Sequence, residues 1–268
     1  MSCCHAVPGQ YSTNCCVANK KPRLLVTRPA AQSARLCSLL EADGFEVIRL
    51  PAIEILDPVN LYELEAVSDE LDSYDLAVFV SVNAVQKGVE FILDRREWPE
   101  QTAIATVGAS SAEALLPYGL SANHVPAHQF NSEALLALEE LQDMSGQRVV
   151  IFRGNGGREY LRDTLLERGA EVDYVEVYRR ACPAVDEAAM LKLLHPGYLD
   201  GITVTSNETL QNLYDMAGAA AQPLLCEVQL VVVSGRQASL ARQLGFSKEP
   251  LLAANASAEA IVAAASGL

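Results

Sequence analysis

The sequence lacks the long apolar runs and the clustered positive charge that are typical of membrane proteins and nucleic-acid-binding proteins. None of its windows reaches the ~18 uncharged apolar residues that a membrane-spanning helix needs. Its 20 Lys and Arg are outnumbered by 34 Asp and Glu, a formal net charge of −14, so little positive charge is left to neutralise phosphates. We therefore expect neither a membrane nor a nucleic acid as a partner.

The usual motifs of metal, nucleophile and nucleotide chemistry are also missing. The four histidines share no ligand spacing, and no G-x-S-x-G motif is present. The stretch RGNGGRE, residues 153–159, resembles a dinucleotide-binding loop, but Glu159 stands where G-x-G-x-x-G requires its third glycine. The Gly-Lys-Ser/Thr of a phosphate-binding loop is absent as well. These absences disfavour metal-dependent and nucleotide-dependent enzymes.

The first 21 residues have neither the apolar core of a secretory signal nor an Arg-rich amphipathic pattern. We therefore expect a cytoplasmic protein in which residues 1–21 form a disordered tail. This segment holds four of the seven cysteines, Cys3, Cys4, Cys15 and Cys16. A metal site that includes His5 is the alternative, although adjacent cysteines bring two thiolates to one ion poorly.

What the chain does contain is an internal repeat with an offset of 125 residues. Residues 22–51 and 147–178 share one pattern: an apolar run, an Arg-containing turn, a helical pattern of apolar residues and then a glycine. Arg28 falls opposite Arg153, and further along the chain Ser81 falls opposite Ser206. Four such matches in order, at a nearly constant offset, indicate a duplication.

Each repeat predicts alternating strands and helices, with strands near 24–27, 47–50, 76–80 and 103–107 and their counterparts one period later. The strands are apolar without alternation, as in parallel sheets covered on both faces. At 268 residues the chain is long enough for two domains. The pattern therefore predicts an α/β fold of two similar doubly wound parallel-sheet domains, and one large α/β domain is the alternative.

Polar and glycine-rich clusters come directly after most of the predicted strands, at the edge where ligands of open α/β sheets collect. Each serine or asparagine there is also a plausible helix N-cap. As a set, these clusters offer backbone N–H groups, hydroxyls and guanidinium groups that bind carboxylates. The candidate ligand-binding residues are Arg28, Ser81, Asn83, Ser110, Ser111, Ser132, Arg153, Gly154, Gly156, Gly157, Arg158, Thr205, Ser206 and Ser234.

At this point several segments resemble one family, the bacterial uroporphyrinogen-III synthases. They are the opening VTRPAAQSARLCSLLEADGFEVIRLPAIEI, then FVSVNAV, VGASSAEAL, RGNGGREYLRDTLLERGAEVDYVEVYRR and ITVTSNETLQNL. The resemblance covers about residues 23–265. It implies a first domain of residues 22–46 and 182–268, a second domain of residues 56–171, and a two-stranded antiparallel linker of residues 47–55 and 172–181.

The resemblance also implies a reaction. Hydroxymethylbilane, an open chain of four pyrroles with acetate and propionate side chains, loses water, and ring D is inverted as the macrocycle closes to uroporphyrinogen III. This makes the protein a hydro-lyase of haem, sirohaem and cobalamin biosynthesis that needs no cofactor and no metal. Transient contact with hydroxymethylbilane synthase is a further expectation.

By the same resemblance, Tyr178 is the candidate catalytic residue, which helps the water to depart; its alternative role is that of a packing aromatic. The sequence departs from the family pattern at Ser111, where threonine is frequent, and at Ser234-Gly235, where Gly-Pro is frequent. The second departure puts the contact at Ser234 in doubt. A two-lobed ligand-binding or sensor protein without turnover would fit the repeat equally well, so only the family motifs favour an enzyme.

Overall fold

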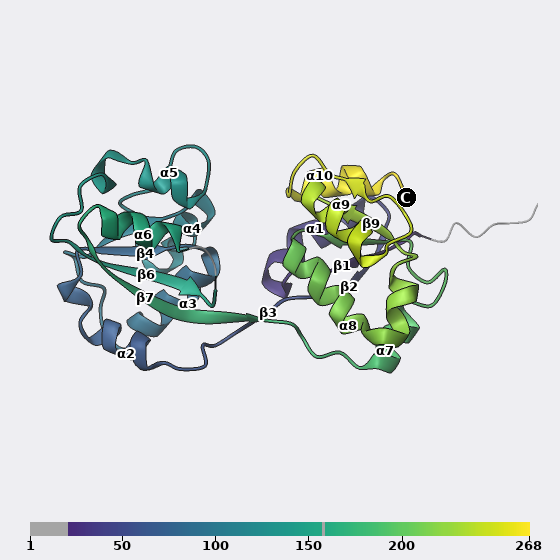
Figure 1. The fold of residues 1–268 in the computed structure, drawn as a ribbon, viewed down its shortest axis with the longest axis horizontal. Helices are drawn as coiled ribbons and strands as arrows, with labels where there is room; N and C mark the ends of the chain where they lie inside the picture. The colour runs from purple at the N-terminus through teal and green to yellow at the C-terminus, as the bar shows by residue number, and fades with distance from the viewer. Residues whose placement is uncertain (1–20, 157–158) are drawn as a thin grey trace, which may run out of the picture. The chain divides into compact units, whose positions relative to one another are not determined.

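The computed structural model describes residues 21–156 and 159–268, and it divides into two compact units (Figure 1). Unit 1 comprises Met1–Ala52 and Ala184–Leu268, and unit 2 comprises Ile53–Pro183. The tail predicted over residues 1–21 lies almost wholly outside the described residues. Within the described part of the chain, no helix is both long and apolar enough to cross a membrane.

Unit 1 is built on a five-stranded parallel sheet of order β10-β9-β8-β1-β2. Leu25 of β1 packs on one face against α7, α8 and α9, whereas Leu24 and Val26 pack on the other against α1 and α10. Helices therefore cover both faces, as the doubly wound prediction requires. The strands are β1 Arg23–Val26, β2 Glu46–Arg49, β8 Gly201–Val204, β9 Gln229–Val232 and β10 Leu251–Leu252, and the helices are α1 Ala30–Ala42, α7 Glu187–Leu193, α8 Asn207–Leu225, α9 Gly235–Leu244 and α10 Ala258–Ala265.

Unit 2 has a five-stranded sheet of order β3-β7-β6-β4-β5, parallel except for the edge strand β3. One face carries the stacked rings of Phe79 and Phe152, whose centroids are 4.8 Å apart. The other face packs Val149 and Ile151 against α6. The strands are β3 Glu54–Leu56, β4 Leu76–Phe79, β5 Ala103–Thr106, β6 Arg148–Gly154 and β7 Glu171–Ala181, and the helices are α2 Tyr62–Asp69, α3 Val82–Leu93, α4 Ala109–Glu113, α5 Ser132–Leu136 and α6 Tyr160–Glu167, with short 3-10 turns at Leu71–Ser73, Leu116–Tyr118 and Glu139–Leu141.

The predicted repeat reappears in the register of the two sheets. Arg23 pairs with Glu46 in unit 1, and Arg148 pairs with Glu171, each 125 residues on, in unit 2. The correspondence extends to side chains, because the backbone N–H of Arg23 donates to Asp200 at 2.7 Å and that of Arg148 donates to the carboxylate of Asp75 at 2.8 Å. The duplication is therefore present in the pairing of individual residues.

The two halves of the chain exchange strands between the units. Strands β1 and β2 from the first half join β8, β9 and β10 from the second half in one sheet, while β3, β4 and β5 from the first half join β6 and β7 from the second half in the other. Each sheet thus contains one strand–helix–strand piece from one repeat and the remaining strands from the other.

The linker predicted over residues 47–55 and 172–181 is shorter in the structure. Residues 47–49 belong to β2 and pair in parallel with β1, and residues 172–176 pair in parallel with β6. Antiparallel pairing is confined to Glu54↔Ala181, Ile55↔Arg180 and Leu56↔Arg179. The reason is burial: Val175 and Val177 are part of the core of unit 2, so this stretch of β7 is a sheet strand.

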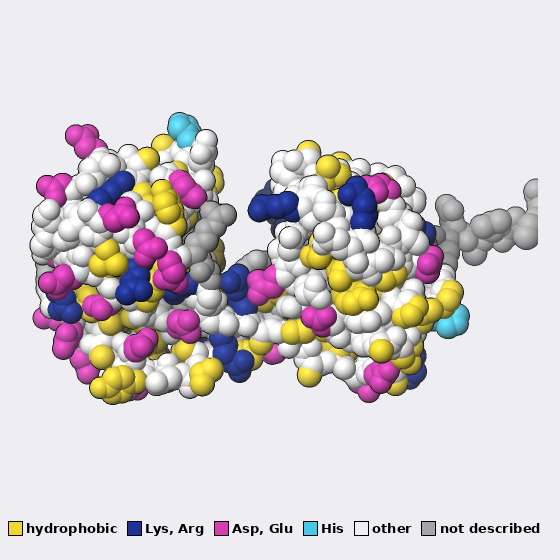
Figure 2. All heavy atoms as spheres, in the orientation of Figure 1, with side chains coloured by type: hydrophobic (Ala, Val, Ile, Leu, Met, Phe, Trp, Pro, Cys, Tyr) yellow, Lys and Arg dark blue, Asp and Glu magenta, His cyan; other side chains and the backbone are white. Residues whose placement is uncertain are grey.

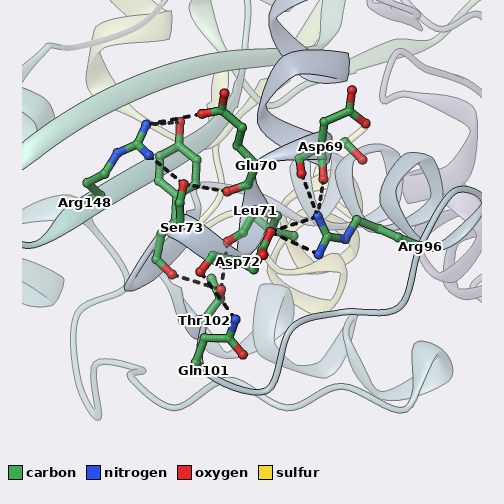
Figure 3. A network of polar contacts seen from close by, with 11 residues as sticks. Asp69, Glu70, Leu71, Asp72, Ser73, Arg96, Gln101, Thr102 and Arg148 are labelled. Atoms are coloured by element: carbon green, nitrogen blue, oxygen red, sulfur yellow. Dashed lines mark hydrogen bonds and ion pairs between the residues drawn. The ribbon is translucent and has the colours of Figure 1, made fainter.

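The amino ends of the strands of unit 2 are closed by a polar network (Figure 3). The guanidinium of Arg148 donates to Ser73 at 2.6 Å and lies 4.4 Å from the centre of the Tyr74 ring. Arg96 donates to the carboxylate of Asp72 and to the backbone carbonyls of Ser68 and Asp69 at the end of α2. Burial, reinforced by a hydrogen bond to a carboxylate on β7, raises the pKa of Tyr74. These groups are therefore engaged with one another at the amino ends of the strands.

Candidate functional site

A pocket of 290 Å³ lies at the carboxyl ends of β4 and β6 in unit 2. It brings together six residues that the sequence singled out: Ser81, Ser132, Arg153, Gly154, Gly156 and Tyr178. Its remaining lining is Val80, Ile151, Leu161, Tyr174 and Arg180. We call it the Tyr178 pocket. Acidic and basic side chains are interspersed on the visible surface of unit 2 (Figure 2), so the donors that line the pocket set its local field.

Tyr178 reaches this pocket because of a bulge in β7. The parallel register with β6 shifts between Arg153↔Glu176 and Gly154↔Tyr178, which leaves Val177 as the extra residue. Bulges of this kind redirect a side chain. As a result Val177 and Tyr178, although consecutive, both pack in the same hydrophobic cluster, and Tyr178 is only 5% exposed.

Gly154 makes room for the ring of Tyr178. A Cβ atom at Gly154 would lie 2.5 Å from both Cε2 and Cζ of that ring, far inside van der Waals contact. The next residue, Asn155, fastens the same turn: its N–H donates to the Tyr178 carbonyl at 3.1 Å, and its side chain accepts from the N–H of Arg180 at 2.7 Å. We call residues 154–156 the glycine turn, and these two hydrogen bonds join it to the end of β7.

Ser81 connects Tyr178 to helix α3. Its Oγ accepts a hydrogen bond from the N–H of Ala84 at 3.1 Å, so Ser81 is the N-cap of α3. The same oxygen lies 3.1 Å from the hydroxyl oxygen of Tyr178. Ser81 thus has the expected capping role and a second contact that the sequence does not reveal.

The side chain of Arg153 folds back onto the residues that follow it in the chain. It is 7% exposed, and its guanidinium donates to the carbonyls of Gly154 and Gly156 and to the carboxylate of Glu159. The guanidinium carbon also lies 4.5 Å from the centre of the Tyr174 ring. Arg153 lines the pocket, but most of its hydrogen-bonding capacity is used to shape the turn. The expected substrate contact of Arg153 stays a prediction.

Tyr174 is a pocket residue that the sequence did not single out, because it reads as one of several aromatics on a strand. It lines the Tyr178 pocket and an adjoining pocket of 460 Å³ whose acidic residues are Glu63, Glu159 and Glu176. Burial, together with the nearby carboxylate of Glu159, raises the pKa of Tyr174. Its hydroxyl is therefore a neutral donor at physiological pH.

Three predicted residues of unit 2 lie outside the Tyr178 pocket. Ser110 and Ser111 line a separate pocket of 180 Å³ after β5, which shares Val80 with the first. Ser111 is only 6% exposed. Asn83 belongs to the first turn of α3 and lines neither pocket. Gly157 and Arg158 lie outside the described residues.

The predicted residues of unit 1 occupy the equivalent strand ends. Ser206 and Ser234 cap α8 and α9, and Ser206 also contacts the hydroxyl of Thr209 at 2.8 Å. Thr205 comes directly after β8 and is half-buried. Arg28 donates to the carbonyl of Ala256 at 2.5 Å, and burial lowers its pKa.

Among residues 21–156 and 159–268, no three His, Cys, Asp or Glu gather as a metal site.

A family model and curated relatives match most of the chain. The family model described as uroporphyrinogen-III synthase HemD matches residues 34–263. The uroporphyrinogen-III synthase of Salmonella typhimurium is 35% identical over 243 residues, which are 90% of this chain and 98% of that protein. The protein of the same name from Escherichia coli K12 is 34% identical with the same coverage.

Solved structures share the fold at low identity. A uroporphyrinogen-III synthetase from Helicobacter pylori aligns with a TM-score of 0.61 at 13% identity, over 92% of this chain and 99% of that one. A mutant uroporphyrinogen III synthase from Thermus thermophilus aligns with a TM-score of 0.57 at 20% identity, over 92% and 96%. At these identities the likeness concerns the fold alone.

Proposed function

This chain belongs to the uroporphyrinogen-III synthase family, and we propose that the Tyr178 pocket is where it acts on its substrate. The protein is a lyase of tetrapyrrole biosynthesis that cyclises hydroxymethylbilane to uroporphyrinogen III. A ligand-binding or sensor protein without turnover is the disfavoured alternative. The roles of individual residues are our proposal.

The reaction requires control of the substrate's geometry and the transfer of one proton to the leaving hydroxyl. The hydroxyl of the substrate departs as water, the azafulvenium cation that remains is attacked by the substituted terminal carbon of ring D, and the spiro intermediate reopens and closes with ring D reversed. Because the substrate is already reactive, orientation supplies most of the selectivity. A single neutral hydroxyl donor beside the leaving group is sufficient to assist the departure of water.

We assign that donor to Tyr178. The observation that carries the assignment is its place: a phenol hydroxyl at the wall of a pocket, fixed by Gly154 beneath its ring and by Ser81 at its oxygen. Tyr178 gives its proton to the departing oxygen and regains one when the closed macrocycle loses its extra proton. The balance is hydroxymethylbilane to uroporphyrinogen III and water, with no net change in the enzyme.

We further propose that the strand-end donors hold the carboxylates of the substrate. In the Tyr178 pocket these are the backbone of the glycine turn and the side chains of Ser132 and Arg180. In unit 1, Arg28 is the strongest candidate, because a half-buried guanidinium binds a carboxylate well. The same role is assigned to Asn83, Ser110, Ser111, Gly157, Arg158, Thr205, Ser206 and Ser234.

The other expectations stay predictions. They are the cytoplasmic location, the transient contact with hydroxymethylbilane synthase, and the role of the antiparallel pair β3–β7 as a linker.

Replacing Tyr178 with Phe tests the proposal. The variant keeps the ring and loses the donor, so we expect the enzymatic rate to fall about 10²- to 10⁴-fold, the usual effect of general acid catalysis. Spontaneous closure should then raise the fraction of the uninverted I isomer. The measurement uses hydroxymethylbilane made in situ and separates the I and III isomers.

Tyr74→Phe is the matched control. Tyr74 is a buried tyrosine, 4% exposed, that donates to Asp173 at 2.7 Å at the amino ends of the strands of the same sheet. It should keep its rate and isomer ratio even though it loses a hydrogen bond. An unchanged rate and ratio in Tyr178→Phe would remove Tyr178 from the mechanism.

A further inference from the structure

We infer that Ser81 is a positioning residue that stabilises the negative charge developing on Tyr178 as this tyrosine gives up its proton. The inference rests on the proposed role of Tyr178 and deepens it. It gives Ser81, which the sequence presents as an N-cap or a substrate contact, a third role that acts through another side chain.

The first step is the contact itself. The oxygens of Ser81 and Tyr178 are 3.1 Å apart, so a hydrogen bond joins them, and either hydroxyl can be its donor while Tyr178 is protonated. Both residues line the same pocket. A ligand in the pocket can therefore reach a pair of coupled hydroxyls.

The second step concerns the direction of that hydrogen bond during the reaction. Once Tyr178 has given its proton to the leaving oxygen, the phenolate oxygen can only accept. The hydroxyl of Ser81 must then be the donor across the 3.1 Å contact. A hydrogen bond to a charged group is stronger than one between neutral groups, so the contact strengthens as the charge develops.

The third step is what holds the Ser81 hydroxyl in place. Its oxygen already accepts from the N–H of Ala84, and this leaves its single proton free to point away from the helix toward Tyr178. Helix α3 is 12 residues long, and the partial positive charge of its first turn favours negative charge nearby. The hydroxyl of Ser81 thus connects the partially positive first turn of α3 to the phenol oxygen of Tyr178.

The glycine turn supports the same geometry from the other side. The Tyr178 ring lies so close to Gly154 that no Cβ would fit, and the buried ring has little freedom to move away from Ser81. The distance between the two hydroxyls is therefore set by the backbone on both sides.

Ser81→Ala tests the inference. It removes the donor, so we expect kcat to fall about 10- to 100-fold, the range for loss of a hydrogen bond to a charged group, while KM stays unchanged. Ser81→Thr retains both the hydroxyl and the cap and should restore most of the rate. A rise in KM with unchanged kcat would instead make Ser81 a plain substrate contact and would overturn the inference.

Ser257→Ala is the control for loss of a helix cap. Ser257 caps α10 by accepting from the N–H of Ala260 at 3.2 Å and is exposed. It should lose a comparable amount of stability and keep its kcat. If Ser257→Ala lowered kcat as much as Ser81→Ala, the effect at Ser81 would be one of capping.

The double variant Ser81→Ala/Tyr178→Phe separates this inference from the proposed function. If Ser81 acts through Tyr178, the double variant is no slower than Tyr178→Phe alone. Additive losses would refute the role of Ser81 and leave that of Tyr178 intact. Tyr178→Phe with unchanged rate would refute the assignment of Tyr178 instead.

Discussion

Units 1 and 2 share four equivalent strands in the same order, β2-β1-β8-β9 and β7-β6-β4-β5, and they differ in the residues at the carboxyl ends of β1 and β6. After β1 the chain reads Arg28-Pro29, and at the end of β6 it reads Arg153-Gly154. In unit 1 the guanidinium reaches across to the carbonyl of Ala256, whereas in unit 2 it folds back on its own turn. The duplicated scaffold therefore places equivalent arginines in different environments.

A second difference concerns the equivalent caps. Ser206 of unit 1 contacts Thr209 of its own helix, while Ser81 of unit 2 contacts Tyr178 from another element. One glycine, one bulge and one tyrosine distinguish this strand end of unit 2 from its counterpart in unit 1. The comparison teaches that the scaffold supplies capped helix termini in both units, and that the proposed chemistry depends on side chains present in only one.

Among the changes that contrast the two units, the largest effect on the rate is expected from Gly154→Ala. The new Cβ would meet the Tyr178 ring at 2.5 Å, so the ring must move. Overpacking of this kind costs about 1–3 kcal/mol of the free energy of unfolding. A displacement of about 1 Å at the reacting hydroxyl lowers the rate on the order of 10²-fold. Chemical denaturation and the isomer assay measure the two effects.

Gly235→Ala is the matched change in unit 1. Gly235 opens α9, and a Cβ there meets no atom within 4 Å. This variant should be as stable as the original or more stable, since alanine favours a helix over glycine. Equal losses in both variants would mean that the two strand ends are not functionally different.

The second prediction contrasts the two arginines. Arg153→Ala removes the donor to the carbonyl of the buried Gly154 and to that of the exposed Gly156, and we expect it to lower the free energy of unfolding by about 3 kcal/mol. Arg28 is partly exposed, so Arg28→Ala should cost less than about 1 kcal/mol and instead raise KM about tenfold or more by loss of a charge-assisted contact.

Denaturation curves and steady-state kinetics on the two variants check this contrast. The reverse outcome, with Arg28→Ala the more destabilised and Arg153→Ala the weaker binder, would contradict the division between a turn-shaping and a substrate-binding arginine.

The smallest effect is the pH dependence that one ion pair of unit 1 contributes to stability. The guanidinium of Arg242, 2.6 Å from the carboxylate of Glu249, lowers the pKa of that carboxyl below its ordinary value. A lowered pKa contributes stability above the unfolded value, and this contribution is lost as the pH falls through the folded value. Pro117 and His124, 125 residues earlier, cannot form this pair in unit 2.

Arg242→Gln should therefore flatten the acid side of the stability profile below pH ~4.3, and high salt should mimic it because both side chains are exposed. Thermal unfolding over the acid range at low and high salt provides the measurement. A profile that stays as steep in the variant would exclude the pair as its source.

Much of the fold could be predicted because its signals are local. The strands expected near 24–27, 47–50, 76–80 and 103–107 lie within a residue or so of β1, β2, β4 and β5, since apolar runs bounded by polar turns mark buried strands. The repeat predicted the equivalent strand register of the two sheets. The exchange of strands between the repeats came from the family resemblance, because periodicity carries no information about which copies pair.

The site was harder to predict because it depends on register and on contacts between distant residues. Nothing in the order Val177-Tyr178 shows that both side chains face one side; only the bulge does. The sequence also cannot show that Arg153 folds inward while Arg28 does not, since both lie at the ends of apolar strands. Asn155 read as a turn residue, but its amide oxygen joins two elements.

The exchange of strands between the two halves of the chain affects the order in which the two units can fold as the chain is synthesised. Unit 2 is a continuous segment, Ile53–Pro183, so it can complete its sheet as soon as it leaves the ribosome. Strand β1 is synthesised before the other strands of its sheet but must wait for β8, about 175 residues later, before its apolar residues are enclosed on that side. The first strand of this sheet to be translated is therefore among the last to be protected from aggregation.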